Sequence, residues 1–164
     1  MTASAPRAAV LTISTSRAAG EAEDEGGPAL AAFAESLGLD VVLRETITDD
    51  RAAIGERLIE LADGSEAELV LTTGGTGFGP ADLTPEATRD AIEREAPGIG
   101  EAMRAVSREH TPHWMLSRAV AGIRGGSLII NFPGSPKSIG EIGDALAPAL
   151  PHALALLAGD DATH

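Results

Sequence analysis

The 164-residue sequence contains no cysteine, which excludes disulfide bonds and thiolate metal sites. It also lacks any run of about eighteen apolar residues, so no transmembrane helix is predicted. The opening MTASAPRAAVLTIS does not have the basic start, long apolar stretch and cleavage site of a secretory signal. We therefore expect a cytoplasmic protein that does not engage a membrane.

Basic residues are also scarce. The chain has 12 lysines and arginines against 25 aspartates and glutamates, which gives a formal net charge of −13. Such a chain repels nucleic-acid phosphates, so we expect no nucleic-acid partner. Lys137 is the only lysine. An anionic ligand would have to be held by local features that overcome the overall negative field.

Several common catalytic motifs are absent as well. The chain has no Walker-type Gly-Lys-Ser/Thr sequence, no dinucleotide-binding glycine fingerprint and no nucleophile elbow. His110 and His113 are not accompanied by residues that would complete a zinc ligand set. The sequence therefore gives little support to acyl hydrolysis or to a zinc centre.

Short apolar segments alternate with helical patterns along the chain. We predict strands over residues 8–13, 40–46, 68–73 and 127–132. Helices are predicted over residues 28–37, 51–62, 84–95, 101–109 and 148–158, with a further helix that begins at Pro136. We expect Thr84 and Ser135 to be N-caps, and PGIG at residues 97–100 to separate two helices. This alternation predicts one domain over residues 1–164, with a three-layer α/β fold in which helices flank a mainly parallel sheet.

The carboxyl ends of parallel strands meet at one edge of a sheet, where ligands bind in such folds. Four predicted loops belong at that edge, namely residues 14–27, 47–50, 74–82 and 133–137. They are chemically the richest loops in the sequence. We therefore expect the functional site at this edge.

The segment of residues 74–82, GGTGFGPAD, is called the glycine loop below. Glycines permit positive φ and allow successive N–H groups to face a phosphate, but they are equally common in tight connections. Asp82 could hold Mg²⁺ or cap the following helix, although Thr84 is available as that cap. Asp49 and Asp50 offer further carboxylates, as magnesium ligands or as solvated turn residues.

Lys137 occupies the second position of its predicted helix. A cation there opposes the helix dipole, which favours anions at this end. We favour a ligand anion shared by Lys137 and the helix N–H groups over a lysine that only extends into water. The STSR segment at residues 14–17 and the pair Ser117 and Arg118 could likewise bind an anion or form turns. Phe78 and Trp114 could stack on a ring or pack against the protein.

Four segments in this order, TTGGTGFGPADLTPEAT, PGIGEAMR, LSRAVAGIRG and LIINFPGSPKSIGE, resemble the molybdenum-cofactor biosynthesis family. The similarity extends over residues 8–158 and is greatest to the molybdopterin adenylyltransferases. It implies ATP, Mg²⁺ and molybdopterin as ligands, with adenylated molybdopterin and pyrophosphate as products. It also implies a homotrimer and hand-over of the product to a molybdate-insertion enzyme. The alternative is a related protein that binds or carries molybdopterin without catalysis.

The resemblance also implies individual roles. Asp49 and Asp82 match the family's essential aspartates, which implies catalysis and metal binding. The ligand-binding residues that it implies are Ser14, Ser16, Asp24, Gly74, Gly75, Thr76, Gly77, Ser117, Arg118, Asn131, Pro133, Gly134 and Ser135. Lys137 is added to this set by the helix-dipole argument. The sequence departs from many relatives at Ala81, where they carry arginine, and at Thr15, where they carry aspartate.

Overall fold

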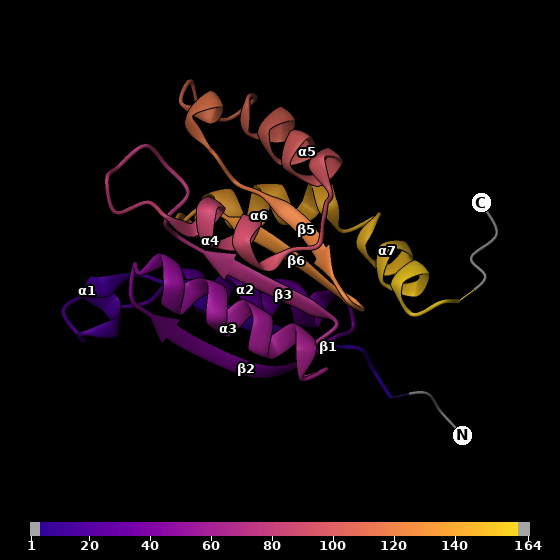
Figure 1. Cartoon of the computed structure of the whole chain (residues 1–164). Helices are drawn as coiled ribbons and strands as arrows, with labels where there is room; N and C mark the ends of the chain where they lie inside the picture. Colours follow the sequence, from indigo (N-terminus) through magenta and orange to yellow (C-terminus); the bar gives the residue numbers. More distant parts are fainter. Residues whose placement is uncertain (1–3, 161–164) are drawn as a thin grey trace.

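The computed structural model describes residues 4–160, which contain one sheet of six strands (Figure 1). The strands lie in the order β2-β1-β3-β6-β5-β4. Their bounds are β1 Arg7–Ile13, β2 Asp40–Ile47, β3 Leu69–Thr73, β4 Arg94–Glu95, β5 Ala121–Arg124 and β6 Ser127–Phe132. The first four strands in this order are parallel, whereas β5 and β4 continue the sheet in antiparallel pairing. The sheet is therefore mainly parallel, as predicted.

Side chains of the central strands alternate between two hydrophobic clusters, one on each face of the sheet. In β1, Ala8 and Val10 enter one cluster, whereas Ala9 and Leu11 enter the other. Burial on both faces explains why this strand has an uninterrupted apolar sequence rather than an alternating one.

Helices cover both faces, which confirms the three-layer architecture. In residues 4–160, four helices pack against the cluster that contains Leu30, Met103 and Ile139, namely α2 Gly26–Ser36, α5 Pro97–Ser107, α6 Pro136–Leu146 and α7 Leu150–Leu157. The opposite cluster, which contains Ile54 and Ala87, is covered by α3 Arg51–Asp63 and α4 Thr84–Ala91. Two short elements, α1 Thr15–Ala18 and the 3-10 turn η1 Trp114–Leu116, bury no residue. No helix in the described range is long and apolar enough to cross a membrane.

The middle of the chain departs from the prediction. The helix predicted over residues 84–95 ends at Ala91, and Arg94–Glu95 pair with β5 instead. The expected break at residues 97–100 is the first turn of α5. Pro97 begins that helix, since an N–H at the first helical position has no intrahelical partner in any case. The sequence does not predict β5, whose four residues are too few to show a periodic pattern.

Two polar segments at the carboxyl edge also differ. The predicted loop over residues 14–27 contains α1 and the start of α2. Thr84 is not the N-cap of α4, because Leu83 occupies that position. The buried hydroxyl of Thr84 donates to the carbonyl of Gly74 at 2.9 Å, and its N–H donates to the carbonyl of Gly75 at 3.1 Å. Thr84 therefore closes the base of the glycine loop.

Candidate functional site

The loops that follow β1, β2, β3 and β6 gather at one edge of the sheet, and Figure 1 shows α1 and the glycine loop at this end. Backbone contacts join them: Ser14 N–H donates to the carbonyl of Ile47 at 2.9 Å, and Gly74 N–H donates to that of Phe132 at 3.2 Å. The chain leaves β1 for β2 on one side and later returns to β3 on the other. Ligands in parallel α/β sheets bind at such a reversal of strand order.

The first two glycines of the loop are required by the protein's own packing. Gly74 and Gly75 have φ angles of 99° and 68°, in the left-handed region that favours glycine. A Cβ on Gly74 would lie 2.5 Å from the carbonyl oxygen of Ile13, and one on Gly75 would lie 2.4 Å from Thr84 Oγ1. These two glycines therefore allow the backbone of the loop to pack closely against β1 and α4.

Asp82 closes the far side of the loop. Its Oδ2 accepts a hydrogen bond from Gly79 N–H at 2.8 Å and does not cap α4. A Cβ on Gly77 or Gly79 would lie 3.0 Å or 2.9 Å from this oxygen. Within residues 4–160, the other carboxylate oxygen of Asp82 has no hydrogen-bond partner. That oxygen remains available to a ligand or a cation.

Asp49 follows β2 and lies near the loop. As in Asp82, only one of its carboxylate oxygens accepts hydrogen bonds in the described range. Its Oδ2 accepts hydrogen bonds from Thr15 N–H at 2.8 Å and from Thr15 Oγ1 at 3.1 Å. Its Oδ1 lies 3.5 Å from the position that a Cβ on Gly75 would take, and in the described range it accepts no hydrogen bond. Asp50, by contrast, caps α3 through Ala53 N–H at 2.8 Å.

The donor chemistry fits Mg²⁺. Among the described residues, Asp49 and Asp82 each keep one carboxylate oxygen without a protein partner beside the same loop. No group of three or more histidine, cysteine, aspartate or glutamate residues that could cage a metal occurs in residues 4–160. Magnesium is commonly held by one or two carboxylates and completed by substrate phosphates and water. The residues present match that mode and not a site built wholly from protein.

The segment after β1 is held by short polar contacts. Ser14 caps α1, with Oγ 3.3 Å from Arg17 N–H and 3.2 Å from Ser16 Oγ. Asp24 accepts from Thr12 Oγ1 at 2.8 Å and from Gly27 N–H at 2.9 Å, which fixes the start of α2. The hydroxyls of Ser14 and Ser16 lie at the predicted edge, whereas the carboxylate of Asp24 is occupied by protein donors.

The loop after β6 joins the same assembly. Thr73 Oγ1 donates to the carbonyl of Pro133 at 2.8 Å, and a Cβ on Gly134 would lie 3.8 Å from Gly74 Cα. Ser135 caps α6 through Ser138 N–H at 3.5 Å. Lys137 is exposed in the first turn of α6 and has no hydrogen-bond or ion-pair partner in the part of the chain that the structure describes.

Three predicted ligand residues make their polar contacts within the protein. Asn131 is fully buried: its amide donates to Thr72 Oγ1 at 3.1 Å and to Thr88 Oγ1 at 2.9 Å, and its Oδ1 accepts from Val120 N–H at 3.1 Å. Thr76 is buried and its carbonyl accepts from Arg118 N–H at 2.8 Å. The Arg118 guanidinium is occupied by protein acceptors.

Ser117 lies directly before this arginine. Its Oγ accepts from Ala119 N–H at 3.4 Å, which places the hydroxyl in a local turn. Sequence reasoning missed Glu86, the carboxylate that pairs with Arg118, as well as Thr73. An acidic residue in a first helical turn has an ordinary explanation in the helix dipole, so position 86 carried no signal of its own.

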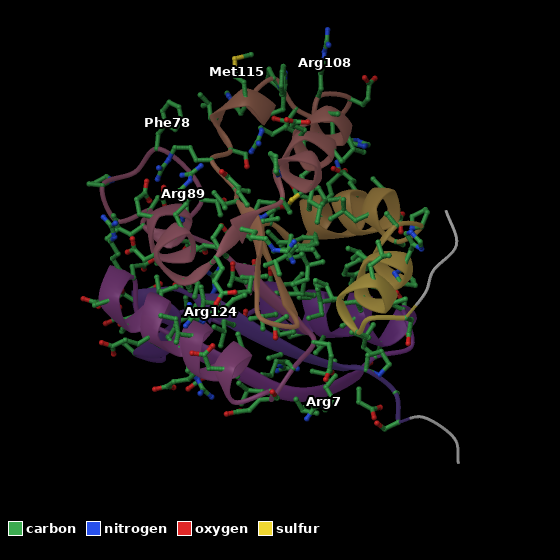
Figure 2. The ribbon with its side chains drawn as sticks, turned by 45° about the vertical axis from the view of Figure 1, so that its right-hand side comes forward. Arg7, Phe78, Arg89, Arg108, Met115 and Arg124 are labelled. Atoms are coloured by element: carbon green, nitrogen blue, oxygen red, sulfur yellow. The ribbon has the colours of Figure 1, made fainter. Side chains whose placement is uncertain are left out.

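The hollows found in residues 4–160 lie elsewhere. A groove of about 560 Å³ is lined by residues that include Arg7, Leu39, Glu68 and Asp160, at the amino edge of the sheet. A second hollow, of about 240 Å³, adjoins it near Ser127. Figure 2 shows Arg7 well away from Phe78 of the glycine loop. The candidate site lies at the opposite edge of the sheet, away from both hollows.

Comparison with known proteins agrees with this geometry. The profile of a family described as "Probable molybdopterin binding domain" matches residues 9–152. The molybdopterin adenylyltransferase of Helicobacter pylori J99 is 47% identical over 116 residues, which are 71% of this chain and 66% of that protein. The protein of the same name from Escherichia coli K12 is 44% identical over 137 residues, or 82% of this chain and 70% of that one.

A solved structure shares the fold as well. The molybdopterin biosynthesis enzyme MoaB from Thermus thermophilus superimposes with a TM-score of 0.88 at 42% identity, over 94% of this chain and 98% of that one. The sheet order, the glycine loop and the extent of these matches lead to one conclusion. The chain belongs to the molybdopterin-binding family of molybdenum-cofactor biosynthesis proteins.

Proposed function

We propose that this protein is a molybdopterin adenylyltransferase, which transfers AMP from MgATP to the terminal phosphate of molybdopterin. The observation that carries the proposal is the pair Asp49 and Asp82, each with one carboxylate oxygen beside the glycine loop that has no partner in residues 4–160. Relatives that are 44–47% identical carry this name, which supports the same activity here.

In the proposed reaction, an oxygen of the molybdopterin phosphate attacks the α-phosphorus of ATP. A new phosphorus–oxygen bond forms, the bond between the α-phosphorus and the bridging oxygen breaks, and pyrophosphate leaves with that oxygen. Because two polyanions must meet, positioning and charge neutralisation are the main catalytic tasks. Mg²⁺, when held by Asp49 and Asp82, would supply positive charge at the phosphates.

The chain's own groups would divide these tasks by position. The glycine loop offers backbone N–H groups, and the exposed Lys137 offers a cation at the start of α6. The hydroxyls of Ser14 and Ser16, together with the loop of Pro133, Gly134 and Ser135, would orient the second substrate. No side-chain nucleophile is required, because the substrate phosphate is itself the nucleophile.

The remaining parts of the proposal concern context. We place the reaction in the cytoplasm, with the chain as a single molybdopterin-binding domain and with hand-over of the product to a molybdate-insertion enzyme. We also propose a homotrimer. Light scattering should then give about three times the chain mass of 16.7 kDa, and a monomer at micromolar concentration would contradict this assembly.

The decisive experiment is an activity assay. Purified protein is mixed with molybdopterin and MgATP, pyrophosphate release is followed, and adenylated molybdopterin is identified by mass spectrometry. Both products should appear in equal amounts, and omission of either substrate should abolish them. Tight binding of molybdopterin without pyrophosphate release would instead identify a carrier protein.

A further inference from the structure

Arg118 makes an unusually complete set of contacts with the protein. Its Nε donates to the carbonyl of Gly77 at 2.7 Å, and its Nη2 donates to the carbonyl of Asp82 at 2.6 Å. Its Nη1 donates to the carboxylate of Glu86, and its backbone N–H donates to the carbonyl of Thr76. Each guanidinium nitrogen thus has a protein acceptor. This occupancy argues against the direct ligand contact predicted for Arg118.

The acceptors lie on both limbs of the glycine loop. Thr76 and Gly77 belong to the incoming limb, and Asp82 belongs to the outgoing limb. Between these limbs, residues 78–81 are exposed. The loop's own closing contacts are those of Gly79 with the N–H and the carboxylate of Asp82. Arg118 therefore ties the two limbs together from the side of η1 and sets the separation between Gly77 and Asp82.

Glu86 fixes the arginine in turn. It lies in the first turn of α4, two residues after Thr84, and its carboxylate forms an ion pair with the guanidinium. The hydrogen bond from Arg118 holds the pKa of Glu86 below its ordinary value, against a smaller opposing effect of burial. The carboxylate is thus charged at neutral pH, and the tie extends from α4 through Arg118 to both limbs of the loop.

The exposure of this pair decides what it can contribute. The side chains of Arg118 and Glu86 are 32% and 31% exposed, so water screens their attraction and the ion pair adds little to global stability. The geometry of the four contacts, however, is specific to the loop. Binding and catalytic constellations depend on supporting residues that fix the position of groups in contact with the ligand.

We infer that Arg118 and Glu86 are positioning residues that hold the glycine loop and Asp82 in their ligand-binding arrangement without touching the ligand. This inference deepens the proposed function, and the kinetic part of its test rests on that function. Displacement of a loop by about 1 Å can lower turnover about a hundredfold. Loss of the Arg118 contacts should therefore lower the efficiency with which MgATP is used. Binding of molybdopterin, which we assign to the loops after β1 and β6, should be affected much less.

The test compares Arg118→Gln and Glu86→Gln with Arg124→Gln as a matched control. Arg124 also binds a carboxylate with two nitrogens, that of Asp63, and donates to the carbonyl of Ala91, but it is the last residue of β5, beside the start of β6. Amide hydrogen exchange of residues 77–82, the melting temperature, and kcat and KM for each substrate are measured on the full chain.

Arg118→Gln should accelerate amide exchange in residues 77–82 and lower kcat/KM for MgATP by about tenfold or more. KM for molybdopterin should change by less than about threefold, and the melting temperature should fall no further than in Arg124→Gln. Glu86→Gln should act in the same direction but more weakly, because the carbonyl acceptors of Arg118 remain.

Unchanged exchange in residues 77–82 of Arg118→Gln would overturn the inference, as would a kinetic loss no greater than that of the control. If the unaltered protein shows no turnover, the proposed function fails separately. The exchange measurement then still decides whether Arg118 and Glu86 hold the loop.

Discussion

Asp49 and Asp82 each combine a structural contact with a free acceptor. One carboxylate oxygen of each is engaged, by Thr15 in one case and by Gly79 in the other. The engaged oxygen fixes the side chain, and the other oxygen is thereby held beside the loop without a partner in residues 4–160. Preorganised groups of this kind lose little conformational entropy when a ligand binds.

Asp82→Asn should separate these two contributions. The amide oxygen can still accept from Gly79 N–H, so the loop should keep its shape, but the charge that would attract Mg²⁺ is removed. Turnover should fall at least about tenfold, because about 1.4 kcal/mol of lost transition-state stabilisation has that effect. Affinity for molybdopterin should change much less. Pyrophosphate release and pterin binding across a magnesium titration provide the measurement.

Asp49→Asn should behave in the same way, and Asp50→Asn is the control. Asp50 is the adjacent carboxylate, but its side chain caps α3, a role that asparagine fills equally well. Full turnover in Asp82→Asn would show that the metal role is wrong. Joint loss of pterin binding and thermal stability would instead assign Asp82 a purely structural role.

Lys137 supplies a second prediction at this scale. Lys137→Ala should weaken binding of ATP or molybdopterin by roughly 1–3 kcal/mol, the usual cost of a lost charge-assisted hydrogen bond. Stability should hardly change, because the side chain is exposed and has no partner in residues 4–160. Calorimetric titration with each ligand measures the effect. Arg94→Ala removes an equal charge from β4 as the control, and equal affinities in both variants would refute the contact.

At the scale of elements, the turn from β3 into the glycine loop limits what the chain tolerates. Gly74→Ala introduces a side chain at a φ of 99° and places its Cβ 2.5 Å from the carbonyl oxygen of Ile13. We expect a loss of more than about 1 kcal/mol in the free energy of unfolding, because either β1 or the turn must shift. Urea denaturation gives this value.

Gly140→Ala is the matched substitution. Gly140 lies within α6, and a Cβ there would meet nothing within 4 Å. Alanine should stabilise that helix by up to about 1 kcal/mol. Equal effects of the two substitutions would mean that the turn relaxes without strain and that Gly74 is not required by packing.

The elements also show where sequence reasoning works and where it stops. Strands buried on both faces, such as β3, have apolar runs that identify them directly. The short strands β4 and β5 contain too few residues for a pattern. β5 forms by pairing with the edge of β6, and β4 forms by pairing with β5. The sequence predicts a break at Pro97, where a helix begins, because proline is found at both the ends and the starts of helices.

The candidate site likewise has features that the sequence predicts and features that it does not. The convergence of the loops follows from parallel strands alone, so it could be predicted. The partners of Asn131 and Arg118 could not be, because Thr72 and Glu86 are 59 and 32 residues away in the sequence. Local spacing contains no information about contacts over such separations. The family resemblance implies ligand contact for both residues, and the structure gives their polar groups protein partners.

At the scale of the whole molecule, charge pairing at the amino edge makes stability depend on pH. Arg7 donates to both carboxylate oxygens of Glu68, and this hydrogen bonding holds the pKa of Glu68 below its ordinary value, against an opposing effect of burial. A carboxyl group whose pKa is lower in the folded state stabilises that state above its unfolded pKa. The stabilisation is lost as pH falls through the folded pKa.

Glu68→Gln should therefore be less stable than the unaltered protein at pH 7. The gap should narrow as pH falls below about 4.3, the ordinary pKa of glutamate, since both proteins then lack the charge. Urea denaturation at pH 7 and pH 3 measures the gap. Glu66→Gln, at a nearby exposed residue with no ion pair in residues 4–160, should show no such dependence. A constant gap would mean that Glu68 stabilises by packing alone.

The amino-edge groove has a practical consequence for how this molecule can be handled. Ser4 and Asp160 both line it. A short linker could thus connect Asp160 to Ser4 in a circularly permuted chain, with new termini opened at an exposed turn such as that of Gly125. For the same reason, immobilisation on a sensor surface through either of these two residues would leave the proposed catalytic edge facing solution.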